Sequence, residues 1–143
     1  MNWTIKTFDQ LISKEIYEIL RSRAEVFVKE QRISYVDPDG VDYKSWHVFA
    51  TENDKVCAYL RAFKDGDDTI KIGRVLTLIH GKGTGTQLMK YAISELKAKT
   101  ACKKIIMDAQ SHAISFYQRL GFTITSEEYL EEGIPHVDME LTL

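Results

Sequence analysis

The sequence predicts an α/β (α+β) fold, in which a single mixed, mostly antiparallel sheet carries helices on both faces. Two observations support this prediction. In the first half of the chain, runs of β-branched and aromatic residues are separated by short turns, which is typical of antiparallel hairpins. In the second half, strand-like and helix-like segments alternate in the order β-α-β-α-β, which favours parallel pairing. A chain of 143 residues is expected to form one domain, spanning residues 1–143.

Each element is expected from its local pattern. Residues 3–8 are predicted to form a short first strand, and Asp9 to cap a helix whose apolar residues recur with a period near 3.6 as far as Phe27. The helical pattern stops at Glu30, and residues 30–44 are predicted to form a loop. Further strands are predicted at 46–51, 56–63, 69–79 and 104–108, with a turn at Asn53-Asp54, helices that end near Thr100 and span 112–120, and a closing hairpin that reaches Leu143.

The predicted strand 69–79 contains one residue that breaks its pattern. Strict alternation puts Arg74 in a row of apolar side chains. Gly73, beside it, offers a position for a β-bulge, which would turn Arg74 out of that row. The alternative is an arginine at the edge of a covered sheet.

A glycine-rich turn over residues 80–86, His80-Gly81-Lys82-Gly83-Thr84-Gly85-Thr86, lies between this strand and an amphipathic helical pattern. Glycines let a backbone approach an anion closely, and the first amides of a helix have no partner within it. The helix dipole and the charge of Lys82 add positive potential. The spacing fits neither a P-loop nor the G-x-G-x-x-G dinucleotide fingerprint. The turn therefore indicates a binding site for a diphosphate.

A second motif follows the apolar run 104–110. Ser111 is predicted to cap the next helix, and Gly121 to end it. Within this segment, Phe116-Tyr117 is followed, after three residues, by Gly121-Phe122.

Together the two motifs resemble those of the GNAT N-acetyltransferases. The turn is similar to the Q/R-x-x-G-x-G/A signature, with His80, Gly83 and Gly85 in its three positions, and the second motif to F-Y-x-x-x-G-F, in the same order and spacing. Segments 26–31, 72–75 and 129–136 resemble the ElaA-like branch. The resemblance implies the GNAT fold, whose parallel fourth and fifth strands splay apart, and acetyl-CoA as acyl donor, with its pantetheine arm between those strands.

The resemblance also implies the residues of the site. The amine acceptor is expected to contact Glu30, Arg74 and His136, and no metal is expected. The coenzyme is expected to contact strand backbone, the glycine turn and the second motif: Leu76, Thr77, Leu78, Lys82, Gly83, Thr84, Gly85, Thr86, Gln110, Phe116 and Tyr117.

Acetyl transfer from a thioester to an amine needs a neutral amine, a stabilised oxyanion and a proton for the departing thiolate. Tyr117 is the predicted acid, because a phenol with a pKa of about 10 stays protonated at pH 7. The alternative is that Tyr117 only fills an apolar helical stripe. A backbone amide near Leu76 is the expected oxyanion donor.

His136 is the predicted general base, since histidine titrates near neutral pH. The alternatives are a structural His136, a base role for His112 or Glu30, or a chain of water molecules. His47, which opens a strand, is expected to be structural. Acidic residues in two segments are candidates for attracting a cationic amine, with a solvated surface cluster as the alternative: Glu30, Asp37, Asp39, Asp42, Glu127, Glu128, Glu131 and Glu132.

Composition narrows the function classes. A formal net charge of −2 argues against a nucleic-acid-binding protein, which carries a basic face. No run approaches the ~20 apolar residues of a membrane span, and the N-terminus lacks the apolar stretch of a signal peptide. Cys57 and Cys102 fit no metal or disulfide spacing, so we expect reduced thiols and a cytoplasmic protein. The expected partner is a small-molecule or peptide amine, with no nucleic acid or membrane, and the chain is expected to be a monomer or a homodimer.

The sequence also departs from the family pattern. His80 replaces the usual Gln or Arg, and the connection between the fourth strand and the glycine turn is about two residues shorter than usual. These departures leave two hypotheses open: an acetyl-CoA-dependent N-acetyltransferase, and a non-catalytic acyl-CoA-binding or interaction domain. A nucleotide-binding protein of another class is a more distant third.

Overall fold

The computed structural model describes residues 1–143, which form an eight-stranded sheet with three α-helices. The strands lie in the order β1-β2-β3-β4-β5-β8-β6, and β7 pairs with β8. Only β4 and β5 pair in parallel. The strands are β1 (Asn2–Thr7), β2 (Trp46–Glu52), β3 (Lys55–Lys64), β4 (Thr69–Thr77), β5 (Lys104–Gln110), β6 (Thr123–Ile124), β7 (Tyr129–Glu131) and β8 (Ile134–Thr142).

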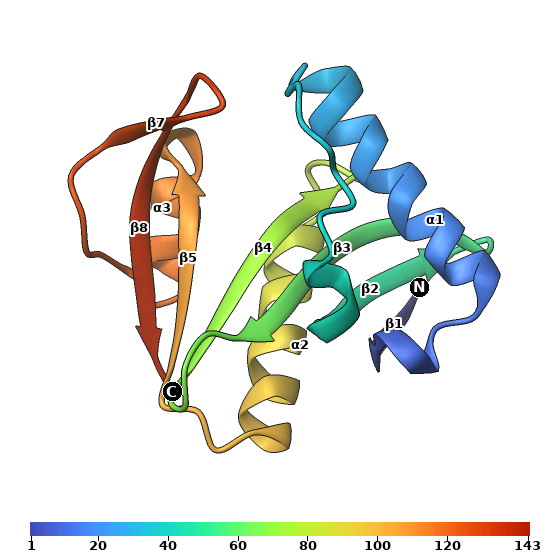
Figure 1. Ribbon diagram of the computed structural model, residues 1–143, viewed down its shortest axis with the longest axis horizontal. Coiled ribbons are helices and arrows are strands. Elements are labelled where there is room, and N and C mark those ends of the chain that lie inside the picture. Colours follow the sequence, from blue (N-terminus) through green and yellow to red (C-terminus); the bar gives the residue numbers. More distant parts are fainter.

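The helices cover both faces of the sheet, as predicted. In Figure 1, α1 (Ser13–Arg23) crosses in front of β2 and β3, whereas α2 (Thr84–Lys99) lies behind β3 and β4. The larger core joins the sheet to α2 and α3 (Ile114–Arg119), and the smaller core joins it to α1 through side chains such as Ile19, Phe49 and Tyr59. None of the helices has both the length and the apolar character that a bilayer crossing requires.

Helix α1 begins later than predicted, so the assignment of Asp9 as its cap was wrong. Residues Phe8–Gln10 form a short 3-10 turn, and the helix starts at Ser13. The Glu15 carboxylate accepts a hydrogen bond from the amide of Ile12 at 2.9 Å and pairs with Lys6. The helical chain continues past Arg23 as a wider π-helical segment, Ala24–Glu30. That extension packs on β4, where its Val26 and Phe27 share the smaller core with Leu76.

The hairpin of β2 and β3 confirms the predicted turn. Asn53 and Asp54 have φ angles of 52° and 64°, the paired left-handed conformation of a type I′ turn, which asparagine and aspartate tolerate better than most residues. The hairpin brings His47 and Arg61 side by side in register. Both side chains bond to the predicted 30–44 loop, His47 to the carbonyl of Asp42 and Arg61 to the carboxylates of Asp39 and Asp42.

The predicted bulge and the predicted splay both occur on β4. Between Tyr59 and Arg61 the register with β3 shifts, so that β4 carries one extra residue, and Arg74 has a φ of 54°. The parallel ladder with β5 extends only from Thr69 to Ile72. Beyond Ile72 the two strands diverge toward the top of Figure 1. Strand β4 ends at Thr77 rather than at 79. The amide of Leu78 donates a hydrogen bond to the backbone carbonyl of Cys57 on β3 at 2.8 Å.

Helix α3 ends as predicted but starts differently. Gly121 has a φ of 103°, and the amides of Gly121 and Phe122 donate to the carbonyls of Gln118 and Tyr117, which is the Schellman end of a helix. Ser111 is not the cap of this helix, because a 3-10 turn (Ser111–Ala113) intervenes and the Ser111 hydroxyl donates to Glu128.

Candidate active site

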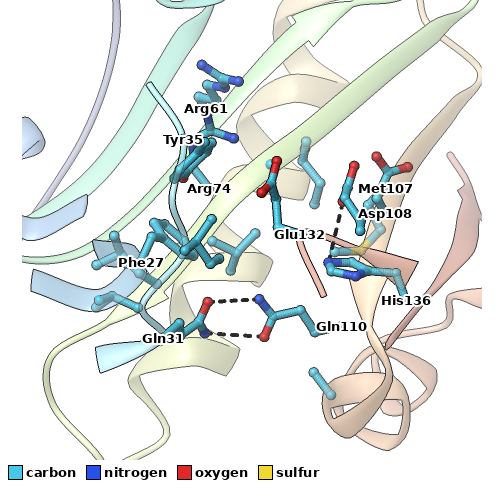
Figure 2. Close-up of a pocket in the computed structure, with 18 of the residues that line it drawn as sticks. Phe27, Gln31, Tyr35, Arg61, Arg74, Met107, Asp108, Gln110, Glu132 and His136 are labelled. Carbon is cyan, nitrogen blue, oxygen red and sulfur yellow. Dashed lines mark hydrogen bonds and ion pairs between the residues drawn. The ribbon is translucent and has the colours of Figure 1, made fainter. Parts of the chain in front are cut away.

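A cavity of about 670 Å³ occupies the space where β4 and β5 diverge. Its walls come from the end of the π-helical segment, the loop over residues 31–41, the outer halves of β4 and β5, the start of α3 and the turn between β7 and β8 (Figure 2). Segments far apart in the sequence thus meet at one opening. Among the predicted site residues, the cavity is lined by Glu30, Arg74, Leu76, Thr77, Gln110, Tyr117 and His136.

The predicted phosphate turn lies at the N-terminus of α2. Gly81 and Gly83 have φ angles of 74° and 71°, which glycine adopts without strain. The amide of Gln87 donates to the carbonyl of Gly83 at 3.0 Å and closes the first helical turn. The amides of residues 84–86 precede that bond, so they have no partner within the helix and point out of its end. This arrangement fits a diphosphate, and Lys82 is exposed beside it.

The two sequence motifs meet in space. A Cβ atom added to Gly85 would lie 3.4 Å from Cζ of Phe116 and 3.8 Å from Cγ2 of Thr77. The first turn of α2 therefore packs directly on the phenyl ring next to Tyr117. That contact sets the position of the turn relative to the cavity wall. It also explains why either Gly or Ala fits this place in the motif, since 3.4 Å is ordinary van der Waals separation.

We expect Gly85→Val to weaken coenzyme A binding at least tenfold, because its two γ-carbons cannot fit against Phe116 without moving the helix N-terminus. Gly85→Ala adds only the Cβ atom that the structure accommodates, and should bind within about threefold of the wild type. Calorimetric titration with coenzyme A measures both. Equal affinities for the two variants would contradict the account of this contact.

Tyr117 is buried in the wall of the cavity, with 6% of its surface exposed. Its ring packs edge-on against Phe116 and Phe122. Burial raises the pKa of the Tyr117 phenol, so the hydroxyl remains protonated at neutral pH. Tyr117 therefore packs in the core, which is the alternative considered from the sequence. It also lines the cavity, which the proposed acid role requires.

The His136 ring is held in one tautomer. Its Nδ1 lies 2.7 Å from the carbonyl oxygen of Ile134, and because a carbonyl only accepts, Nδ1 must carry a proton. In the neutral ring Nε2 therefore keeps its lone pair. The Glu131 carboxylate lies 3.5 Å from Nε2, and Tyr129 stacks on the ring. His136 can accept a proton at Nε2, and the resulting cation has a carboxylate beside it.

A network of three arginines and three aspartates fastens the loop over the sheet. Arg23, which is fully buried, bonds to Asp37 at 2.9 Å and to Asp42 at 2.7 Å. Arg61 bonds to Asp39 at 2.8 Å and to Asp42 at 3.2 Å, and Arg74 to Asp37 at 3.0 Å. The suggestion that Asp37, Asp39 and Asp42 attract a cationic amine is thereby corrected, because arginines already neutralise their charges.

The network also explains two single residues. His47 is buried, and burial lowers its pKa. Its Nε2 donates a hydrogen bond to the Asp42 carbonyl at 2.9 Å, and Nδ1 of the neutral ring accepts one from the Tyr59 hydroxyl at 2.7 Å. Its structural role is confirmed. Arg74, turned by the bulge, lies 4.6 Å over the ring of Tyr35 and lines the cavity. Burial raises the pKa of Tyr35 to about 12, so its phenol is neutral at pH 7. This wall of the cavity therefore holds the neutral Tyr35 ring next to the Arg74 guanidinium, which is paired with Asp37.

Three carboxylates of the cavity remain without a lysine or arginine partner. Asp108 pairs with Lys71 at 3.1 Å and Asp39 with Arg61. Glu30 and Glu132 have no ion pair, and Glu131 has only His136. The uncompensated charge at this opening is therefore negative. Glu127 and Glu128, which were candidates from the sequence, do not line the cavity.

A pair of glutamines in the cavity could not be predicted from the sequence. Gln31 and Gln110 face each other across the cavity and exchange two hydrogen bonds, of 3.2 Å and 3.0 Å, between their carboxamides (Figure 2). Gln110 was expected to contact the coenzyme, whereas Gln31 was not singled out. No local pattern reveals a pair separated by 79 positions.

The remaining predicted residues are placed as follows. Leu78 packs on the smaller core and does not line the cavity, and His112 is exposed at the cavity rim. Cys57 and Cys102 are free and buried. No group of three histidine, cysteine, aspartate or glutamate side chains is arranged to hold a metal ion.

Comparison with known proteins agrees with this architecture. A family profile described as Acetyltransferase (GNAT) domain matches residues 6–143. A UPF0039 protein of Schizosaccharomyces pombe is 35% identical, with 100% of this chain and 98% of that protein aligned. The solved Escherichia coli ElaA is 32% identical over 98% of both chains, with a TM-score of 0.92, and an acyl-CoA N-acyltransferase from Pseudomonas aeruginosa is 34% identical over 99% of both, with the same TM-score. The chain is therefore an acetyltransferase of the GNAT family and belongs to its ElaA-like branch.

Proposed function

We propose that the protein transfers an acetyl group from acetyl-CoA to a primary amine by direct attack of the amine on the thioester. Acetyl-CoA supplies the activated acyl group. The observation that carries the proposal is the packing of Gly85 on Phe116, which joins the helix N-terminus suited to a diphosphate to the wall that contains Tyr117. A solved aminoglycoside 6′-N-acetyltransferase complexed with coenzyme A shares the fold, with 15% identity and a TM-score of 0.75.

The proposed roles follow from the chemistry of each group. The amides of residues 84–86 bind the diphosphate, and the backbone of β4 beyond Ile72, which has no ladder partner on the β5 side, pairs with an extended arm. An amide of this strand, near Leu76, stabilises the oxyanion. His136 Nε2 takes the proton of the ammonium, directly or through water.

These groups account for every bond and proton that changes during acyl transfer. The amine lone pair forms a C–N bond to the carbonyl carbon, and the C–S bond breaks with its electron pair remaining on sulfur. Nε2 of His136 has already taken the ammonium proton and releases it to solvent. The Tyr117 hydroxyl protonates the thiolate, and the proton that the new amide nitrogen loses returns to the Tyr117 oxygen, directly or through water. The negative charge at the opening, from Glu30, Glu131 and Glu132, favours arrival of the amine as a cation.

The function is tested by incubating the protein with acetyl-CoA and a panel of primary amines and following the release of free thiol. Turnover of any amine above the uncatalysed rate supports the enzyme. Binding of coenzyme A without turnover of any amine would instead support the second hypothesis, a non-catalytic acyl-CoA-binding domain.

We expect His136→Ala to lower kcat/KM about 10²-fold at neutral pH and to flatten the acid limb of the pH–rate profile, because the group whose protonation stops the reaction is gone. His112→Ala, which changes an exposed histidine at the rim, is the comparison and should retain that limb. Full pH profiles of both variants provide the measurement. If the acid limb survives in His136→Ala, this residue is not the base.

A further inference from the structure

We propose that the Gln31–Gln110 pair binds an amide group adjacent to the reacting amine, so that the acceptor is an α-amino amide, such as the N-terminus of a peptide. This inference rests on the proposed function and narrows its acceptor. It begins with the two hydrogen bonds that the carboxamides exchange across the cavity, at 3.2 Å and 3.0 Å (Figure 2).

The pair has unused hydrogen-bonding capacity. A carboxamide carries two N–H donors and an oxygen with two lone pairs, and each partner commits one donor and one lone pair to the other. One donor and one lone pair remain on each side chain. Both side chains are half-buried and line the cavity, and each holds the other in orientation. The free donor and acceptor therefore match the C=O and N–H of an amide group.

The position of the pair sets the distance from amide to amine. Gln110 is the cross-strand partner of His136 in the β5–β8 ladder, and the side chains of such partners start about 5 Å apart on the same face. An amine delivered to Nε2 of His136 therefore lies close to an amide held by Gln110. An N-terminal amine and its own amide fit within one residue length, about 3.5 Å. A lysine side-chain amine is separated from its amide by a flexible four-carbon stem, so it reaches the same spacing only by ordering and folding that stem.

The protonation chemistry points to the same acceptor. An α-amine has a pKa near 8, whereas a lysine amine has one of about 10.4. A histidine base is better matched to the first, since a far larger fraction is already neutral at pH 7. The carboxylates of Glu131 and Glu132, beside His136, suit the remaining ammonium form.

The experiment compares two acceptors of the same shape. L-alaninamide carries an amide next to its amine, and 3-methylbutan-2-amine replaces that amide with an isopropyl group. The double variant Gln31→Met/Gln110→Met keeps the side-chain length and removes the hydrogen-bonding groups. Gln118→Met, on the exposed side of α3, is the matched control. The readout is the ratio of kcat/KM for the two amines, which cancels any general loss of activity.

We expect the ratio to fall at least tenfold in the double variant, as two hydrogen bonds are lost, and to remain unchanged in Gln118→Met. The circular-dichroism spectrum and cooperative thermal unfolding of the double variant, compared with the wild type, show that it is folded, and each single variant should give an intermediate ratio. An unchanged ratio, or an equal gain in rate for both amines, would overturn the proposal.

Two further acceptors complete the test. An alanine-initiated pentapeptide that outperforms L-alaninamide identifies a polypeptide as the source of the amide, and the reverse identifies a small amide; both agree with the shared chemistry. Nα-acetyl-lysinamide, which offers only a side-chain amine, should be a poor substrate. If it is preferred, the inference fails while the acetyltransferase stands. If no amine is turned over, the proposed function itself has failed.

Discussion

Tyr117→Phe is expected to lower kcat by about 10²- to 10³-fold while coenzyme A affinity stays within about twofold of the wild type. The substitution removes only the hydroxyl, and general acid catalysis typically contributes a factor of this size. The ring remains packed against Phe116 and Phe122, so the wall of the cavity and the contact with α2 should survive. The thiolate then departs without a proton from the protein.

The measurement combines thiol release at saturating substrate with calorimetry of coenzyme A. Tyr91→Phe is the matched control, because Tyr91 lies on α2 against Trp3 and does not line the cavity. A wild-type kcat in Tyr117→Phe would remove the acid role and leave Tyr117 as a packing residue.

Arg23→Met is expected to destabilise the fold by about 3 kcal/mol or more. Removing one partner of a buried ion pair leaves its carboxylates uncompensated, which typically costs 3–5 kcal/mol. Asp37 and Asp42 retain one arginine each, Arg74 and Arg61, so the loss should lie at the lower end. In a chain of this size the melting temperature should fall by about 10 °C.

The network also predicts how stability depends on pH. Burial raises the pKa of Asp42, but its hydrogen bond and attraction to Arg23 outweigh burial, and the net pKa is lowered. A lowered folded-state pKa stabilises the protein above the unfolded value, near 3.9, and that stability is lost as the pH falls through the folded value. Arg23→Met should therefore show a weaker acid dependence than the wild type.

Thermal unfolding as a function of pH measures both effects. Lys14→Met is the control, since the Lys14–Asp54 pair is exposed at 3.6 Å and such pairs contribute at most about 1 kcal/mol. Equal losses in Arg23→Met and Lys14→Met would contradict the view that the network holds the loop over the sheet.

Features that depend on neighbouring residues could be predicted from the sequence. The turn at Asn53-Asp54, the bulge beside Gly73 and the end of α3 at Gly121 each follow from the conformations that one or two residue types tolerate. The glycine turn was predicted in the same way, because its chemistry is local. The start of α1 was not predicted correctly. The carboxylate of Glu15, rather than that of Asp9, accepts the hydrogen bond from the amide of Ile12 at the beginning of the helix.

Features that depend on distant partners were missed for a physical reason. In the sequence, Asp37, Asp39 and Asp42 resemble an exposed acidic loop. Their ion-pair partners Arg23, Arg61 and Arg74 are distant in the chain and are brought to them only by folding. The Gln31–Gln110 pair joins the end of a π-helical segment, which sequence periodicity does not distinguish from an α-helix, to the end of a strand. Neither arrangement leaves a pattern within a window of the chain.

The proposed position of the coenzyme is best examined in a crystal structure of the protein with coenzyme A. We expect the diphosphate within hydrogen-bond distance of the amides of residues 84–86, and the sulfur atom beside the Tyr117 hydroxyl. A coenzyme bound away from the N-terminus of α2, or a sulfur atom remote from Tyr117, would contradict it.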